Sequence, residues 1–441
     1  MNSGDIAAVT IDRVGAEGDG IALAPDGATL YIPDALPGEL VRAEKLRRQG
    51  GGWYVPHTGV LRASEARVPP SCTHFGACGG CVLQHWRDAE YRAWKTGLLD
   101  AALRRAGFAD PRIEPIQVTP GQSRRRMDLA ARRTPRGVVV GLHARIPSSA
   151  NWERVPHPAD TICDLTECQV LHPALFALIA PLRPLLTRLQ SLHREASVIA
   201  NLLDHGADLL LRTDAPLNRS DRERLIGFAR THRLLRLSTA PLHGEAEPVV
   251  VLQPPRITLS GVTVEPPPGA FLQASRDGET AIVQAVLAGL PEKPPARARV
   301  GELYAGSGSI TLALAQRVRV AAWEGDAAAA AALRQAVNRS GLAGRVTVAQ
   351  RDLARQPVPA GELAGFAAVV LDPPFAGAAV QMAPIAAAKS ARVIYVSCNP
   401  AVLARDARVL HEAGYALQVA TPVDQFLWSA RLESVCVFVR T

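Results

Sequence analysis

The feature that most constrains the fold is an alternation of short apolar runs with helical patterns from residue 300 onward. Apolar runs begin near residues 300, 318, 346, 368 and 392, and helical patterns begin near residues 309, 326, 378 and 400. Two more apolar runs, near residues 416 and 435, have no helix between them. Parallel strands are usually joined by helical crossovers, whereas antiparallel neighbours need none. The pattern therefore predicts an α/β protein with a doubly wound sheet and an antiparallel edge.

One of these apolar runs is followed closely by a cysteine, Cys398. The apolar residues 393–396 lead into Ser397 and Cys398, and Asn399-Pro400 ends the run. Because open α/β sheets bind ligands at the carboxyl ends of their strands, Cys398 is a candidate nucleophile. The alternative is a core cysteine, since free cysteine is among the most buried residue types.

Two neighbouring runs indicate a cofactor crevice at the same edge. Residues 300–312 predict a strand, a turn through Gly306 and Gly308, and a helix. Thr311 stands where the dinucleotide fingerprint has its third glycine, so NAD is disfavoured. Glu324 follows about 20 residues after the turn, where such folds hold ribose hydroxyls. Another apolar run ends in Asp372 and two prolines, which adds a carboxylate to this edge.

Several motifs together resemble the bacterial 5-methyluridine RNA methyltransferases, class I enzymes that use S-adenosylmethionine. They are Glu-Leu-Tyr-Ala-Gly-Ser-Gly at 302–308, Leu-Asp-Pro-Pro at 371–374, Val-Ser-Cys-Asn-Pro at 396–400 with Leu-Ala-Arg-Asp at 403–406, and Leu-Glu-Ser-Val at 432–435. The resemblance covers nearly the whole chain. It implies a class I methyltransferase domain with S-adenosylmethionine as cofactor and RNA as partner.

The chemistry of uracil C5 methylation explains why a cysteine thiol would be needed. Uracil C5 is a poor nucleophile until a thiolate adds to C6 and turns the ring into an enolate, and Cys398 would supply that thiolate. The C5 proton must then leave, which requires a general base. By resemblance that base is Glu433. The alternative is a surface glutamate, but the apolar residues 435–439 predict a buried strand here.

Five further positions are expected at the cofactor. In the family, the glutamine of the Phe-x-Gln stretch contacts S-adenosylmethionine, which implies Gln273. Tyr304, Glu324 and Asp372 would line the same site, and Asp352, after the third strand, would meet the adenine. The alternative for Tyr304 is a structural position in the core. The alternative for Gln273 is that it only neighbours a helix cap.

Residues 1–62 alternate short β patterns with turn signals, which predicts a small five-stranded barrel. The segment resembles the TRAM domain, an OB-like RNA-binding module. Phosphate contacts are then expected from Arg42, Lys45, Arg47 and Arg48, and base stacking from Trp53 or Tyr54. The alternative is a solvated β face without a ligand.

Cysteines at 72, 78 and 81 follow a C-x5-C-x2-C pattern in a glycine-rich turn. In a reducing compartment this pattern indicates metal ligands, with Cys163 or Cys168 as the fourth. Spacing alone leaves zinc and an iron–sulfur cluster open. The family resemblance implies Cys72, Cys78, Cys81 and Cys168 as ligands of a [4Fe-4S] cluster.

Charge and hydropathy restrict the partners. The net charge of +8 suits a polyanion, although a general arginine excess explains it equally well. No signal peptide is visible, and prolines and an arginine interrupt the most apolar stretch, residues 174–186. We expect a cytoplasmic monomer without membrane contact. Its predicted domains are the barrel (1–62), a β-rich central domain with the cysteine cluster (63–290) and the catalytic domain (291–441).

The expected reaction is methylation of uridine C5 in ribosomal RNA, of the 23S class, through a covalent adduct between Cys398 and C6. The barrel and the cysteine cluster favour ribosomal RNA, because the tRNA-acting relatives typically lack both. The first alternative is methylation of uridine C5 in tRNA. A second alternative is a non-catalytic iron–sulfur RNA-binding assembly factor. Three departures from the family cluster beside the predicted base pocket. Phe375 stands where arginine is usual, Arg431 where histidine is expected, and Phe426-Leu427-Trp428 replaces a Phe-Pro pair. These departures bear on the target nucleotide more than on the reaction.

Overall fold

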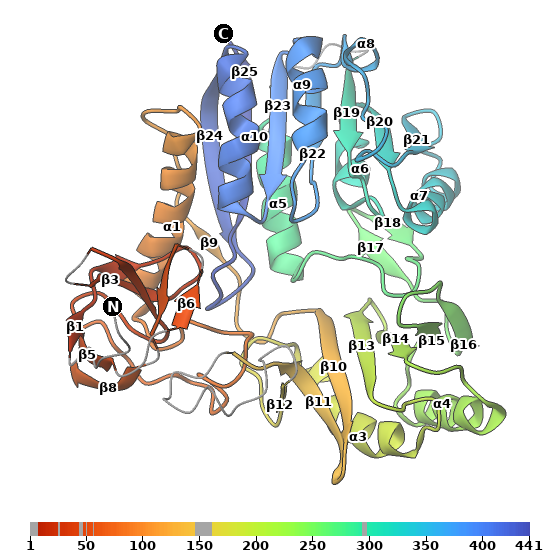
Figure 1. Ribbon diagram of the computed structural model, residues 1–441. Helices are drawn as coiled ribbons and strands as arrows, with labels where there is room; N and C mark the ends of the chain where they lie inside the picture. Colours follow the sequence, from red (N-terminus) through yellow and green to blue (C-terminus); the bar gives the residue numbers. More distant parts are fainter. Residues whose placement is uncertain are drawn as a thin grey trace.

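The computed structural model describes residues 8–24, 27–43, 47–49, 51–55, 57–145, 161–292 and 298–441. The chain forms an N-terminal β module, a central β-rich region and a C-terminal α/β region (Figure 1). Lys45 lies outside the described residues, as do the side chains of Arg47 and Arg48. Among the described helices, none combines the length and apolar character needed to cross a membrane.

The C-terminal sheet has eight strands in the order β21-β20-β19-β22-β23-β25-β24-β9. The strands from β21 to β23 are parallel, while β25 runs antiparallel to both β23 and β24. Their bounds are β9 Gln117–Val118, β19 Arg299–Leu303, β20 Arg319–Glu324, β21 Val346–Gln350, β22 Ala368–Leu371, β23 Arg392–Ser397, β24 Tyr415–Asp424 and β25 Glu433–Arg440. The predicted doubly wound sheet with an antiparallel edge is confirmed.

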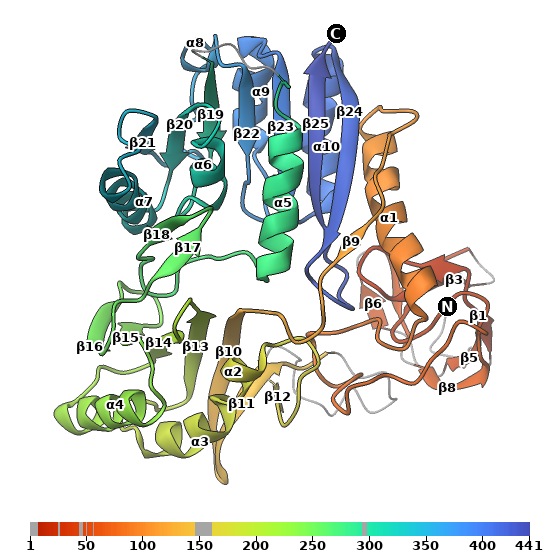
Figure 2. The same cartoon turned by 180° about the vertical axis from the view of Figure 1, so that it is seen from behind.

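Helices cover both faces of this sheet, as the opposite views in Figure 1 and Figure 2 show. Alternate strand residues point to opposite faces, so Val370 joins one apolar core and Val369 the other. The helices are α1 Asp88–Arg105, α5 Arg276–Ala288, α6 Ser309–Leu314, α7 Ala327–Arg339, α8 Ala360–Leu363, α9 Ala379–Ala388 and α10 Pro400–Glu412. The face with α5, α6 and α7 forms one core, and the face with α1, α9 and α10 forms the other.

Helix α1 and strand β9 join this sheet from far earlier in the chain. Strand β9 pairs in parallel with β24, and α1 packs on α10. The fully buried Lys95 of α1 donates hydrogen bonds to Asp424 and to the carbonyl oxygens of Phe426 and Arg431, at 3.0 and 2.7 Å. Residues before 291 thus complete the C-terminal sheet and fix the loop before β25. The predicted domain boundaries at 62 and 290 remain predictions.

The central region is a seven-stranded sheet in the order β12-β11-β10-β13-β14-β15-β16. Strands β10 and β11 form a hairpin in which Thr134 lies opposite Gly137. Bounds are β10 Arg126–Thr134, β11 Gly137–His143, β12 Ile162–Asp164, β13 Glu195–Leu202, β14 Ala207–Thr213, β15 Arg236–Pro241 and β16 Glu247–Val251. The helices are α2 Pro173–Phe176, α3 Ile179–Arg188 and α4 Arg219–Thr231, and a separate hairpin, β17 Ile257–Leu259 with β18 Val262–Val264, leads to α5.

The N-terminal module departs from the predicted five-stranded barrel. Its described residues form eight short strands in two sheets, β1-β5-β8 and β2-β3-β4-β7-β6. They are β1 Val9–Thr10, β2 Arg13–Val14, β3 Gly20–Leu23, β4 Thr29–Ile32, β5 Leu40–Ala43, β6 Arg47–Gln49, β7 Gly52–Tyr54 and β8 His57–Arg62. Strands β1, β5 and β8 form one sheet and the strands between them in the chain form the other, so the described residues hold more and shorter strands than predicted. Tyr54 is buried, so Trp53 is the better placed of the two stacking candidates.

Candidate active site

The predicted nucleophile and base lie on adjacent strands. Cys398 follows β23 at its carboxyl end, and Glu433 opens β25. In this antiparallel pair Ser397 lies opposite Ser434, so the same register brings Cys398 level with Glu433. The chain reverses through Asn399, whose side chain caps α10 by accepting from the backbone N–H groups of Ala401 and Val402. The structure therefore brings together two residues that the sequence could link only by resemblance.

The environment of Glu433 raises the proton affinity of its carboxyl group. Its side chain is only 3% exposed, and Oε1 has no hydrogen-bond partner among the described residues. Oε2 accepts a hydrogen bond of 3.0 Å from Gln425. Burial, with Asp372 nearby, raises the pKa of Glu433 to about 8. A base whose pKa lies near the working pH is well suited to proton transfer.

A glutamine relay connects Glu433 to Asp372. Gln425 Nε2 also donates to Gln273 Oε1 at 2.7 Å, and Gln273 Nε2 donates to Asp372 Oδ2 at 3.0 Å. Gln425 Oε1 in turn accepts from the backbone N–H of Ala274 at 2.9 Å. Gln425 was missed in the sequence because no motif marks it. The available signal was a glutamine directly after an apolar strand, which is weak by itself.

The cofactor residues collect at the carboxyl ends of successive strands. Tyr304, Glu324, Asp352 and Asp372 follow or end β19, β20, β21 and β22, while Gln273 precedes α5. Glu324 Oε2 accepts from the backbone N–H of Gly306 at 2.7 Å, which anchors the glycine turn. Burial, with Asp406 and Asp352 nearby, raises the pKa of Tyr304 to about 12. The structure thus places all five predicted residues on one edge of the sheet.

Gly308 is required for the turn to close. Its φ is 101°, a left-handed conformation that side chains disfavour, and an added Cβ would lie 2.4 Å from Cδ1 of Leu333. This close approach lets α6 begin at Ser309 directly beneath the turn.

Glu302 is a second residue that the sequence analysis missed. It lies in β19, is 2% exposed, and its Oε2 has no hydrogen-bond partner among the described residues. Burial raises its pKa to about 8, and the nearby Asp372 and Glu324 add to the effect. Burial likewise raises the pKa of Asp372 to about 7. The signal in the sequence was a carboxylate inside an apolar run. Crowded buried carboxyls suit a cationic ligand, and S-adenosylmethionine carries a sulfonium and an ammonium group.

Substitution of Glu302 by glutamine should flatten the pH dependence of stability in the ligand-free protein. A carboxyl with a raised folded-state pKa destabilises the fold progressively as pH rises from its unfolded value toward about 8. Each such group contributes up to about 1.4 kcal/mol per pH unit in that window. We expect the thermal midpoint of Glu302→Gln to exceed the wild-type value increasingly from pH 5 to about pH 8 and by a constant margin above that. The exposed Glu412→Gln variant is the control, and parallel curves for Glu302→Gln and wild type would contradict the assignment.

The Cys398 thiol is protonated before substrate arrives. Burial raises its pKa to about 12, with Glu433 and Asp372 adding to the shift and Arg431 opposing it. A thiolate therefore requires either added positive charge or proton transfer at the site. Binding of a cation beside the carboxyls would supply such a charge.

The predicted metal ligands share one cavity. Cys72, Cys78, Cys81 and Cys168 line a space of about 470 Å³ together with Phe426 and Arg431. Cys163, on β12, does not line it. Burial raises the pKa of Cys78 to about 11 and that of Cys81 to about 12, with other thiols nearby adding to both. Within the described residues no three Cys, His, Asp or Glu side chains are arranged to hold a single metal ion. Four thiols that line one cavity supply the sulfur donors that a zinc or iron–sulfur site uses.

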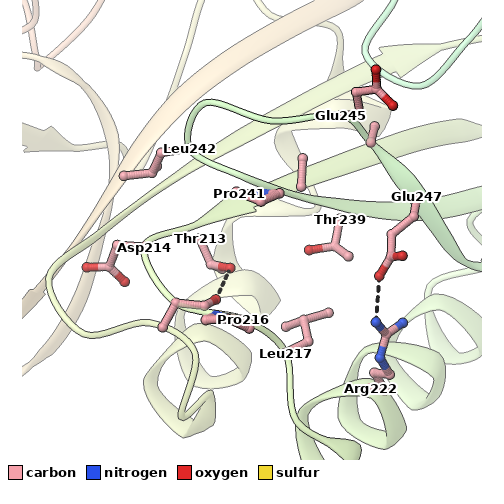
Figure 3. A pocket seen from close by; sticks show the side chains of 13 residues that line it. Thr213, Asp214, Pro216, Leu217, Arg222, Thr239, Pro241, Leu242, Glu245 and Glu247 are labelled. Carbon is pink, nitrogen blue, oxygen red and sulfur yellow. Dashed lines mark hydrogen bonds and ion pairs between the residues drawn. The ribbon is translucent and has the colours of Figure 1, made fainter.

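Another cavity, of about 560 Å³, lies in the central region between β14, β15, β16 and the start of α4 (Figure 3). Its prominent polar groups already pair with each other or with backbone. Arg222 forms a 2.5 Å ion pair with Glu247, and Thr213 donates to the carbonyl of Ala215 at 2.8 Å. None of the predicted site residues lines it, so we assign no chemistry to it.

Comparison with known proteins finds family models and relatives that match this chain. The tRNA (Uracil-5-)-methyltransferase family model matches residues 358–441, and the Conserved hypothetical protein 95 model matches residues 284–397. An uncharacterized RNA methyltransferase of Brucella suis is 37% identical over 100% of this chain and 99% of its own. The 23S rRNA (uracil(1939)-C(5))-methyltransferase of Chromohalobacter salexigens is 34% identical over 98% of this chain and 89% of its own.

A solved structure shares the fold over the full length. The Pyrococcus abyssi tRNA (uracil-54, C5)-methyltransferase, in complex with S-adenosyl-L-homocysteine, superposes with a TM-score of 0.73 at 19% identity. The match covers 98% of this chain and 99% of that one.

Proposed function

Because the chain belongs to the RNA (uracil-5-)-methyltransferase family and acts as an S-adenosylmethionine-dependent RNA uracil-C5 methyltransferase, we propose that it methylates ribosomal RNA, of the 23S class, through a covalent adduct on Cys398. The observation that carries the mechanism is the strand register that sets Cys398 beside Glu433, a buried carboxyl whose pKa is raised to about 8.

The proposed reaction proceeds by addition of the thiolate to uracil, methyl transfer to C5, and elimination of the thiolate. The Cys398 thiolate forms a bond to uracil C6, and the C5–C6 π electrons move onto the ring as an enolate. S-adenosylmethionine supplies an electrophilic methyl, which C5 accepts while the S–CH3 bond electrons stay on the departing sulfur. Glu433 then removes the C5 proton, the electrons re-form the C5–C6 double bond, and the Cys398 sulfur leaves as thiolate. Gln425 holds Glu433 in place through its 3.0 Å hydrogen bond.

The cofactor is proposed to lie along the edge formed by Gln273, Tyr304, Glu324, Asp352 and Asp372. Glu324 would accept from ribose hydroxyls, since it ends β20 beside the glycine turn. Asp352 would meet the adenine. The buried Asp372 and Glu302 would face the cationic part of the cofactor, which supports assigning this edge to a sulfonium ligand rather than to an anion.

The ribosomal substrate is supported by the N-terminal β module, the cysteine cavity and the likeness to the 23S rRNA enzyme. Nucleoside mass spectrometry of separately purified 23S rRNA and tRNA from a deletion strain tests it. Loss of 5-methyluridine from 23S rRNA alone is the expected result. Loss from tRNA alone would favour tRNA methylation, and loss from neither would favour a non-catalytic RNA-binding role.

We further propose that Cys72, Cys78, Cys81 and Cys168 hold a [4Fe-4S] cluster, whose role is structural or in RNA contact because methyl transfer moves no single electrons. Cys168→Ala should lose iron and the visible iron–sulfur absorbance, whereas Cys163→Ala should keep both. The two variants remove the same atoms from neighbouring positions, so they form a matched pair. Iron loss in Cys163→Ala only, or a colourless wild type with stoichiometric zinc, would contradict the ligand set.

A further inference from the structure

An exposed aromatic ring stands at the mouth of the candidate active site. Phe375 follows the Asp372-Pro373-Pro374 strand end and is 48% exposed, which is unusual for a large apolar side chain in a short loop. Its carbonyl accepts a 3.3 Å hydrogen bond from the side chain of Asn399, the neighbour of Cys398. The loop that carries the ring is therefore tied to the nucleophile.

The guanidinium group of an arginine lies over this ring. The guanidinium carbon of Arg431 is 4.2 Å from the centroid of Phe375, within the range of a cation–π contact. Arg431 comes two residues before Glu433, and its charge acts on Cys398 by opposing the rise in the thiol pKa. The pair thus joins the segment before the base to the loop after Asp372, directly beside the nucleophile.

The backbone under Arg431 is fixed while its side chain is not buried. Lys95, fully buried, donates a 2.7 Å hydrogen bond to the Arg431 carbonyl, and the Arg431 N–H donates to Ser429 Oγ at 3.2 Å. The arginine side chain itself is 43% exposed, and it forms a long ion pair of 3.9 Å with the exposed Glu17. Because its backbone is held in place and the exposed ring of Phe375 lies beside it, the guanidinium group of Arg431 is preorganised to bind a planar ligand.

We propose that Phe375 and Arg431 form a stacking platform for the unpaired nucleobase next to the target uridine, an inference that rests on the proposed site at Cys398 and Glu433. Single-stranded nucleic acids bind by stacking bases on aromatic rings and guanidinium planes. The target base must reach Glu433, which is 3% exposed, so it lies deeper than Phe375. The exposed ring at the entrance therefore receives the flanking base.

The test measures RNA affinity without turnover. In a Cys398→Ala background, Phe375→Ala should raise the Kd for a uridine-containing single-stranded oligonucleotide about tenfold, and Phe375→Trp should change it less than about twofold. With abasic sites on both sides of the uridine, Phe375→Ala should have little further effect, because the ring then has no base to contact. Val380→Ala removes another exposed apolar side chain, 51% exposed, and serves as the control.

Equal losses of affinity for intact and abasic RNA, or none for either, would overturn the proposal. Arg431→Met should leave the salt dependence of binding unchanged, and a slope reduced by about one would instead assign Arg431 to a phosphate. Failure of the proposed reaction is seen separately, as absence of a Cys398 adduct with 5-fluorouridine RNA in the otherwise wild-type enzyme.

Discussion

Cys398→Ala is expected to abolish methyl transfer to RNA, with turnover reduced about 10⁴-fold or more, because uracil C5 stays unreactive without addition at C6. Incorporation of labelled methyl from S-adenosylmethionine into bulk rRNA measures the loss. The variant should still bind the cofactor, since the cofactor residues lie on other strand ends. It should also fail to form the denaturation-resistant adduct that 5-fluorouridine RNA gives with the wild type.

Cys436 offers a matched control for this variant. It lies in β25, fully buried in the core that α10 covers, and its removal leaves the strand-end chemistry untouched. Cys436→Ala should lower thermal stability through the lost packing and retain methyl transfer at the wild-type order of magnitude. Equal incorporation by wild type and Cys398→Ala would end the assignment of Cys398 as the nucleophile.

Glu433→Gln is expected to trap the enzyme after methyl transfer. The amide cannot accept the C5 proton, so the cysteine cannot be eliminated, and turnover should fall about 10²- to 10⁴-fold. Glutamine keeps the shape of the side chain and can still accept the hydrogen bond from Gln425. We expect a covalent protein–RNA species that contains one transferred methyl, visible on a denaturing gel and by mass spectrometry.

Two results would contradict the role of Glu433. Normal turnover in Glu433→Gln would show that another group removes the proton. An adduct that lacks the methyl group would show that Glu433 acts before methyl transfer, for example on the Cys398 thiol, whose pKa its charge helps to raise. Glu412→Gln, at an exposed helix end, should behave as wild type in both assays.

The sequence was most informative where a strand ends in a polar residue. Cys398 and Asp372 each follow an uninterrupted apolar run, and the edge of a parallel sheet brings such ends together. Gln425 and Glu302 could not be found in this way. Their importance comes from burial and from partners on other strands, which depend on the order of strands in the sheet and not on local pattern.

The contacts between segments distant in sequence escaped sequence reasoning for the same reason. Phe375 and Arg431 were each recognised as departures from the family, yet only the antiparallel placement of β25 beside β23 sets them in contact. In the N-terminal module the β patterns indicated strands, but the division of the strands between two sheets depends on pairing between strands distant in sequence. Strand β9, at Gln117–Val118, is too short to leave a pattern.

The arrangement of α1 has a consequence for how the nascent chain matures. The apolar side of this helix, with Leu99 and Leu103, is covered by elements near the C-terminus, and Lys95 finds its carboxylate partner only in Asp424. During translation, helix α1 is synthesised early but stays unburied until β24 and β25, near the C-terminus, have emerged from the ribosome. Fragments that stop short of β24 and β25 should therefore be prone to aggregation, and holdase chaperones should engage this protein at α1.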